Sequence, residues 1–203
     1  MKTLVGAWLG DDLELNEREI EALIAMAKEG LVDVAAVGNE VMYRKDLTEE
    51  QLLAYIQRVK DAIPDIPVGY VDAYYQFIER PKLIDACDLV LCNFYPFWEG
   101  VSIDYSMSYL NSMFEVTKLA SKGKRMIIAE TGWPSAGEIV ETAVPSEINA
   151  MKYFIVAQEW ASHNKIETFH FSSFDESWKV MQEGKVGTSW GLWDKNEKFK
   201  YKK

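Results

Sequence analysis

The sequence has few cysteine and histidine side chains, which form disulfides or bind transition metals. Its 203 residues include two cysteines and two histidines. Cys87 and Cys92 are five positions apart, which strand alternation would place on opposite faces, so we predict two buried, reduced thiols rather than a disulfide or metal pair. His163 and His170 form no ligand pattern and are interpreted as structural residues. We expect neither a metal nor a cofactor.

Positive charge and long apolar runs are also scarce. The formal net charge is −10, which disfavours nucleic acid and anionic membrane surfaces as partners. No apolar run approaches the roughly 20 residues that cross a bilayer. The first residues reach Asp11 and Asp12 too soon for the apolar core and cleavage site of a signal peptide. We therefore expect no membrane span and no export signal in this chain, and its compartment stays open.

What the sequence contains instead is an alternation of short apolar runs and amphipathic segments. Six apolar runs are predicted as buried strands: Thr3–Leu9, Val34–Val37, Pro67–Val71, Leu89–Phe94, Met126–Ala129 and Thr168–Phe171. Helices are predicted over residues 16–29, opened by an Asn16 cap, and 48–63, opened by a Thr48 capping box. Similar patterns cover 104–121 and 145–163. Strands that are apolar on both faces and are followed by helices predict a parallel sheet covered by helices.

Two architectures fit that pattern, an open doubly wound sheet and a (β/α) barrel. No glycine-rich phosphate loop follows a strand, which disfavours a nucleotide-binding sheet. Nearly every predicted strand ends in polar and aromatic residues, among them Tyr70 and Asp72, which we take as substrate-binding candidates. In a barrel such strand ends converge on the face that carries the site. The sequence thus predicts one α/β domain of (β/α)-barrel type over residues 1–203.

Two carboxylates stand out at strand ends. Glu40 follows Asn39 after the second predicted strand, and Glu130 follows the fifth. In a structural interpretation, Glu40 pairs with Arg44 and Glu130 accepts backbone amides in a turn. In a catalytic one, the two flank a glycosidic bond, which for a retaining enzyme requires carboxyl groups about 5–5.5 Å apart. Aromatic residues near the strand ends suit the apolar faces of sugars.

Three ordered motifs, AAVGNEVMYR, IIAETGWPSAG and FSSFDESWK followed by GLWD, carry a family resemblance. They resemble the signatures of strands four, seven and eight of glycoside hydrolase family 17, the β-1,3-glucanase family of retaining (β/α)8 enzymes. The shorter stretches GAWLG, NFYPFWEG and AVPSEINAMKYF resemble its bacterial branch. The similarity runs from about residue 3 to residue 194.

The resemblance implies roles for particular residues. Glu40 would be the general acid/base, Glu130 the nucleophile, and Asn39 a hydrogen-bond partner of the sugar 2-hydroxyl. It also implies a charged pair, Glu176 and Lys179, after the last strand. The residues that would line the glucan groove are Tyr95, Phe97, Trp98, Trp133 and Trp178.

The family's first two strands match nothing in the sequence. The six predicted strands then correspond to strands three to eight, an incomplete barrel whose open edges expose unpaired backbone groups. We expect self-association to cover these edges; membership of a larger or split barrel, or cover by the chain's own ends, are alternatives. The leading hypothesis is a retaining hydrolase or transglycosylase acting on β-1,3-glucan oligosaccharides. Its alternative is a weak or inactive barrel that binds glucan or serves as a scaffold.

Overall fold

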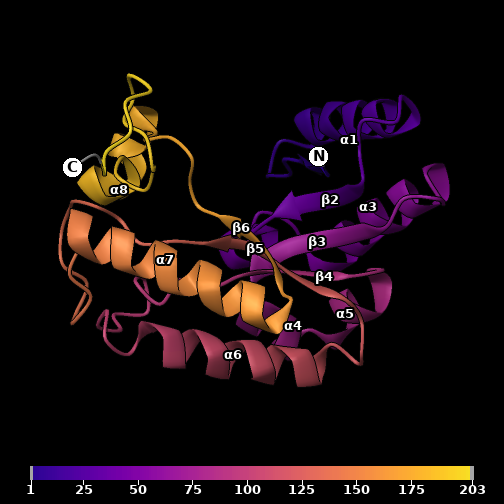
Figure 1. Ribbon diagram of the computed structural model, residues 1–203. Helices are drawn as coiled ribbons and strands as arrows, with labels where there is room; N and C mark the ends of the chain where they lie inside the picture. The colour runs from indigo at the N-terminus through magenta and orange to yellow at the C-terminus, as the bar shows by residue number, and fades with distance from the viewer. Residues whose placement is uncertain (1, 202–203) are drawn as a thin grey trace. The chain divides into compact units, whose positions relative to one another are not determined.

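The computed structural model describes residues 2–201 and contains all six predicted strands (Figure 1). The elements in chain order are β1 (Leu4–Ala7), α1 (Leu13–Lys28), β2 (Val34–Asn39), α2 (Val41–Arg44), α3 (Glu49–Ala62), β3 (Val68–Ala73), α4 (Tyr74–Glu79), α5 (Pro81–Ala86), β4 (Val90–Asn93), α6 (Ser106–Ala120), β5 (Met126–Thr131), α7 (Glu147–Asn164), β6 (Glu167–His170), the 3-10 helix η1 (Ser177–Lys179) and α8 (Val180–Gly187). The chain divides into two compact units, residues 1–93 with 116–127 and residues 94–115 with 128–203.

The strands are parallel and follow one another in the order of the chain. In the first unit β1 pairs with β2, β2 with β3 and β3 with β4, all in parallel. The start of β5 continues this order, because the Val90 amide donates to the Arg125 carbonyl at 2.9 Å. In the second unit the Phe171 amide, just after β6, donates to the Thr131 carbonyl at the end of β5, also at 2.9 Å. Six parallel strands alternating with helices form an α/β fold of (β/α)-barrel type, with fewer than the eight strands of a full barrel.

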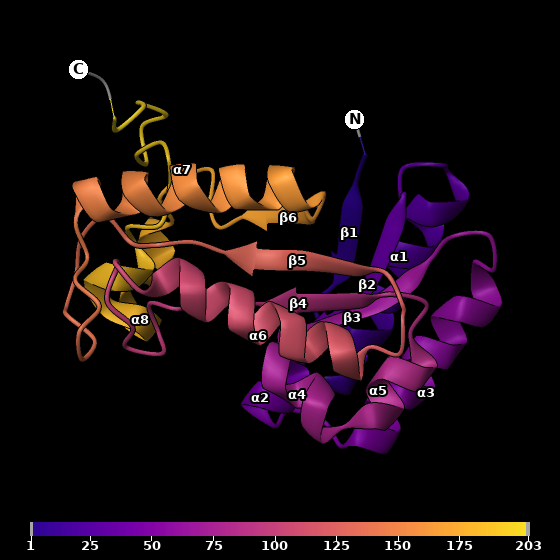
Figure 2. The same ribbon diagram turned by 60° about the horizontal axis from the view of Figure 1, so that its bottom comes forward.

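Helices of the first unit cover its strands from one side. α1 lies against β1 and β2, and α3 lies against β2 and β3 (Figures 1 and 2). Their apolar faces are fully or almost fully buried, including Ile20 and Leu23 of α1 and Leu52 and Ile56 of α3. This burial explains why a 3.6-residue apolar period predicts both helices correctly.

One of the two predicted N-terminal helix caps is correct and the other is wrong. Thr48 caps α3 as predicted, and Gln51 completes the capping box. The predicted Asn16 cap is wrong, because α1 begins earlier and Asp12 accepts the amides of its first turn. Asn16 is instead buried and bonds both the amide and the carbonyl of Gly10 at 2.8 Å.

The second unit is built on an aromatic core. Helices α6 and α7 lie side by side in Figure 1 and are joined by a 3.2 Å hydrogen bond from Trp160 Nε1 to Asn111 Oδ1. The core residues of this unit are Phe97, Trp133, Ala143, Ala150, Tyr153, Ala157, Val186 and Trp190. Aromatic side chains contribute large buried areas, so this cluster is a main source of the unit's stability.

The two cysteines match the sequence prediction. Both are buried and free, and burial raises the pKa of the Cys87 thiol to about 12. Between residues 2 and 201, no helix combines the length and apolarity needed to cross a bilayer.

Candidate active site

The turn after β2 holds Glu40 in an unusual backbone conformation. Glu40 has φ 54° and ψ 28°, the left-handed region that residues other than glycine rarely adopt. Gly38, two positions earlier, has φ 84°, and a Cβ there would lie 2.8 Å from a methyl carbon of Val41. The Glu40 amide donates to the Val71 carbonyl of β3 at 2.8 Å. Backbone strain of this kind persists only where surrounding contacts enforce it, and it clusters at functional sites.

The Glu40 carboxyl group is held by a residue that sequence analysis missed. Asn93, at the end of β4, donates through Nδ2 to Glu40 Oε1 at 3.0 Å and to Asn39 Oδ1 at 3.3 Å. Asn93 is only 2% exposed, whereas Glu40 and Asn39 are half-buried. Asn93 therefore orients both residues of the Asn-Glu motif. The available clue was its position, since it ends a strand as Asn39 does.

Arg44 has a different role from the salt bridge considered for Glu40. Its guanidinium donates to the Asn39 carbonyl at 2.6 Å, to the Leu9 carbonyl at 2.9 Å and to Asp46 at 2.7 Å. It also lies over the Trp8 ring at 4.7 Å. Within the described chain it forms no ion pair with Glu40, so that structural interpretation of Glu40 is wrong. Arg44 instead donates hydrogen bonds to backbone carbonyls near the turn and so holds that part of the chain in place.

Tyr70 and Asp72 do not line an open groove. Both side chains of β3 are fully buried, which does not fit the sugar contacts predicted for them. Asp72 Oδ2 accepts the Tyr70 hydroxyl and the amides of Met42 and Tyr43 in α2. Burial raises the pKa of Asp72 to about 6 despite these donors, and the nearby charge of Glu40 adds to the rise. Their contacts make them supports of the α2 turn.

Glu130 lies in β5, one residue before its end, and is half-buried. The Tyr95 hydroxyl donates to Glu130 Oε2 at 2.6 Å. The Tyr95 ring is itself fixed by edge contacts with Phe171 and Trp190, at centroid distances of 6.0 and 5.3 Å. Sequence analysis missed the role of Trp190, although an aromatic-rich Trp-Gly-Leu-Trp stretch marks it. The second carboxylate thus has an oriented donor of its own.

The residues after Glu130 explain the Glu-Thr-Gly-Trp motif. The Thr131 hydroxyl is hydrogen-bonded to Tyr153 of α7 at 2.6 Å. A Cβ at Gly132 would come within 2.0 Å of the Phe171 carbonyl oxygen, so only glycine fits there. Trp133 is 1% exposed and donates from Nε1 to the Val144 carbonyl at 3.0 Å. The motif combines a strand-end carboxylate with core packing.

The aromatic residues predicted to line the groove fall into two groups. Phe97 and Trp133 are buried in the core of the second unit, so the groove role predicted for them is replaced by packing. Trp98 and Trp178 are 43% and 63% exposed, and Tyr95 is half-buried beside Glu130. Only this second group has ring surface available to a ligand.

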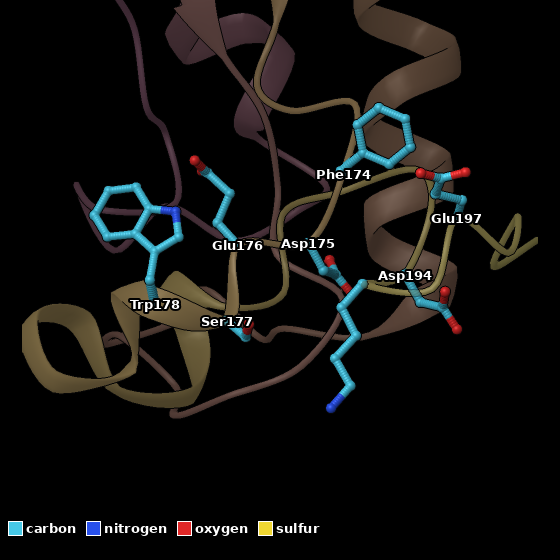
Figure 3. A pocket seen from close by; sticks show the side chains of 8 residues that line it. Phe174, Asp175, Glu176, Ser177, Trp178, Asp194 and Glu197 are labelled. Carbon is cyan, nitrogen blue, oxygen red and sulfur yellow. The ribbon is translucent and has the colours of Figure 1, made fainter.

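A hollow of about 290 Å³ follows β6 in the second unit (Figure 3). Glu176 and Trp178 lie on one side of it, and Phe174 and Glu197 on the other. Lys179 Nζ lies 2.8 Å from Glu176 Oε2, as the predicted charged pair requires, and 5.2 Å from the centre of the Trp178 ring. Carboxylates beside exposed rings are a common lining for carbohydrate sites.

Comparison with known proteins identifies the family. Residues 1–191 match the BtgE/BtgC glycoside hydrolase domain. The chain belongs to this glycoside hydrolase family. Glucan 1,3-beta-glucosidase BGL2 of Candida albicans is 30% identical to it, over 97% of this chain and 71% of that protein.

Solved structures extend the relationship of this glycoside hydrolase chain. A glycoside hydrolase family 17 β-1,3-glucanosyltransferase from Rhizomucor miehei has a TM-score of 0.89 and 32% identity, covering 99% of this chain and 75% of that one. An active-site mutant of the Rhizomucor miehei enzyme in complex with laminaritriose gives the same values. The resemblance to family 17 in the sequence motifs is thereby confirmed.

Proposed function

We propose that this chain cleaves β-1,3-linked glucan with retention at the anomeric carbon, as a hydrolase or a glucanosyltransferase. The observation that carries the proposal is that each strand-end glutamate has its own oriented donor, Asn93 for Glu40 and Tyr95 for Glu130. Asn93 is buried and Tyr95 is half-buried, and each donor holds its carboxylate in a fixed orientation, as a reacting group requires. The family membership and the names of the relatives support the same substrate class.

In the first step Glu130 is the nucleophile. One oxygen of its ionised carboxylate forms a bond to the anomeric carbon while the bond to the glycosidic oxygen breaks. The carboxyl proton of Glu40 passes to that leaving oxygen, so the departing sugar leaves as a neutral alcohol. The product of the step is a glycosyl ester on Glu130, with Glu40 now ionised.

In the second step Glu40 acts as the base. It takes a proton from a water molecule or a sugar hydroxyl, whose oxygen attacks the anomeric carbon and displaces Glu130. Water gives hydrolysis, and a sugar hydroxyl gives a longer glucan. Both glutamates return to their starting protonation states.

Sugar recognition is proposed for the exposed parts of the two units. Trp98 and Trp178 offer ring faces for stacking, and the Glu176–Lys179 pair offers hydrogen-bond partners for hydroxyl groups. Asn39 is proposed to contact the 2-hydroxyl, where a hydrogen bond strengthens in the transition state. A relative binds laminaritriose, and we propose a β-1,3-glucan oligosaccharide as the ligand here.

The test is turnover of laminarin oligosaccharides by the wild-type chain, Glu130→Ala and Glu40→Gln. Chromatography of the products separates hydrolysis, which yields shorter chains only, from transfer, which also yields longer ones. The expected result is turnover by the wild type with retained configuration by proton NMR. Turnover no higher than that of the two variants, in a folded sample, would overturn the proposal and favour a binding remnant or scaffold.

We also propose that the chain self-associates through the edge of β1. Among residues 2–201, β1 pairs with a strand on one side only, β2. Leu4 and Val5 are half-buried in the chain alone, and an open strand edge favours pairing with another chain. Light scattering at micromolar concentration tests the self-association, because the mass of a monomer would refute it.

A further inference from the structure

We propose that Asp72, with Tyr70, is a positioning residue that sets the place of Glu40 by clamping the first turn of α2 onto β3. The inference rests on the acid/base role proposed for Glu40. It adds a specific claim, that a buried carboxylate which cannot touch substrate controls proton donation to the leaving group.

Three consecutive residues of β3 form the clamp. The Tyr70 hydroxyl accepts the Met42 amide at 2.9 Å and donates to Asp72 Oδ2. The Val71 carbonyl accepts the Glu40 amide at 2.8 Å. Asp72 Oδ2 accepts the Met42 and Tyr43 amides at 3.2 and 3.3 Å. The amides of Glu40 and of the second and third residues of α2 are therefore all held by one strand.

The clamp acts on the backbone around Glu40, which has an unfavourable conformation. Glu40 has a left-handed backbone conformation, and α2 begins at the next residue. The Arg44 amide, at the end of α2, donates to the Glu40 carbonyl at 2.8 Å. Without the acceptors on β3, the Met42 amide would be a buried donor without a partner, and the Tyr43 amide would lose its bond to Asp72. The turn could then relax toward an ordinary backbone conformation, which would move the Glu40 carboxyl group away from Asn93.

Charge on Asp72 matters because one oxygen serves three donors. The pKa of Asp72 is raised by burial only to about 6, so the group is ionised at neutral pH. The titratable groups that interact with it are Glu40 on the turn, Tyr70 on its own strand and Cys92 on the neighbouring strand β4, and Arg44 at the end of α2 acts on Tyr70. In Asp72→Asn, the side-chain NH₂ group takes the place of one of the two carboxylate oxygens. If it replaces Oδ2, it faces the three donors that Oδ2 accepts; if it replaces Oδ1, it faces the Ala73 amide, which Oδ1 accepts at 2.7 Å. A donor then faces a donor in either orientation.

The experiment compares two laminaribiosides, one with a sugar leaving group and one with dinitrophenol. Dinitrophenol leaves without protonation, so a defect in the general acid affects kcat/KM for the sugar substrate only. Asp72→Asn is expected to lower that kcat/KM about 10- to 100-fold, the range expected for a misplaced catalytic group. Its kcat/KM for the dinitrophenyl substrate is expected to stay within error of the wild type. Tyr70→Phe keeps both amide partners of Asp72 and is expected to show a smaller defect of the same kind.

Asp88→Asn is the matched control. Asp88 also accepts a β3 amide, that of Val68 at 2.9 Å, and pairs with Lys60 at 2.7 Å, but it lies at the opposite end of the strand. It is expected to affect both substrates equally. An equal fall on both substrates for Asp72→Asn, or no fall, would overturn the positioning role; if that variant does not fold, Tyr70→Phe decides on the same criterion.

Glu40→Gln separates this inference from the proposed function. One outcome is that kcat/KM depends strongly on the leaving group in Glu40→Gln but not in the Asp72 and Tyr70 variants. That outcome refutes the clamp and leaves the proposed function standing. No dependence in Glu40→Gln, or an inactive wild type, refutes the acid/base assignment and the clamp with it.

Discussion

The side-chain amide of Asn93 donates a 3.0 Å hydrogen bond to Oε1 of Glu40. The same nitrogen reaches Asn39 Oδ1, so one buried side chain at the end of β4 holds both residues of the motif at the end of β2. Side chains that sit within a fixed geometry react faster than mobile ones, because their orientation is set before the reaction begins.

Replacing Asn93 tests the value of that orientation. Asn93→Ala removes the donor to Glu40 and is expected to lower kcat on laminarin oligosaccharides about tenfold with a smaller change in KM, since the lost bond orients a reacting group. Steady-state kinetics measure both parameters. Asn111→Ala, which removes an amide side chain from α6, is the control and should leave kcat near the wild-type value. A kcat unchanged by Asn93→Ala would contradict the orienting role.

The hydroxyl of Tyr95 should matter in the same way for Glu130. Tyr95→Phe keeps the ring between Phe171 and Trp190 but removes the 2.6 Å bond to Oε2. A hydrogen bond to a charged group contributes roughly 1.5–3 kcal/mol, so kcat/KM is expected to fall about 10- to 100-fold. Tyr153→Phe removes another hydroxyl of this unit, the one bonded to Thr131. It should lower stability more than activity, and the reverse ranking of the two variants would count against our assignment.

The fold was predictable where apolar pattern alone decides it. All six strands were predicted from short apolar runs, yet β2, β3 and β5 extend past the predicted ends to include Asn39, Asp72 and Glu130. Their backbones pair with neighbouring strands whatever their side chains are. Helices α2, α4 and α5 have four to six residues, too few for a 3.6-residue period to be recognised.

The candidate site was predictable only in part, for a different reason. Glu40 and Glu130 stand in motifs with a local signature, so their positions at strand ends followed from sequence. The partners Asn93 and Tyr95 depend on how side chains of neighbouring segments meet, which no local pattern encodes. Burial of Trp133 likewise depends on packing against α7 and α8, so the sequence could not separate it from the exposed aromatics.

An ion pair stabilises the C-terminal part of the second unit. Lys200 Nζ lies 2.7 Å from Asp175 Oδ1 and 2.8 Å from Ser135 Oγ, and the two charged side chains are 12% and 18% exposed. Lys200→Met leaves the Asp175 charge with little solvent and is expected to cost about 3 kcal/mol. Urea unfolding followed by tryptophan fluorescence measures it. Adding Asp175→Asn should recover part of the loss, and a double variant as unstable as the sum of the singles would show that the pair is not coupled.

The stability of the chain should depend on the charge of Asp72. Its folded pKa of about 6 is above the 3.8 of an unperturbed aspartate, so the stability that it contributes is fully present below about pH 4 and is lost as the pH rises through about 6. The shift corresponds to roughly 2–3 kcal/mol. The free energy of unfolding of the wild type, minus that of Asp72→Asn, should therefore fall by this amount between pH 4 and pH 6 in urea titrations. A difference that stays constant would refute the raised pKa.

His170 should produce the opposite slope over an overlapping range. Its ring stands edge-on to Phe154 at 4.7 Å, and its buried Nδ1 has no hydrogen-bond partner among residues 2–201. Burial lowers its pKa from 6.5 to about 4, so the stability it contributes is present above pH 6.5 and is lost as the pH falls through about 4. The free energy of unfolding of the wild type, minus that of His170→Gln, is expected to shrink on acidification from pH 6.5 to pH 4 by roughly 2–3 kcal/mol. Because the Asp72→Asn difference grows over the same acidification, each variant controls for the other. Equal slopes in the two variants would mean that a general acid effect, rather than these two buried groups, sets the pH dependence.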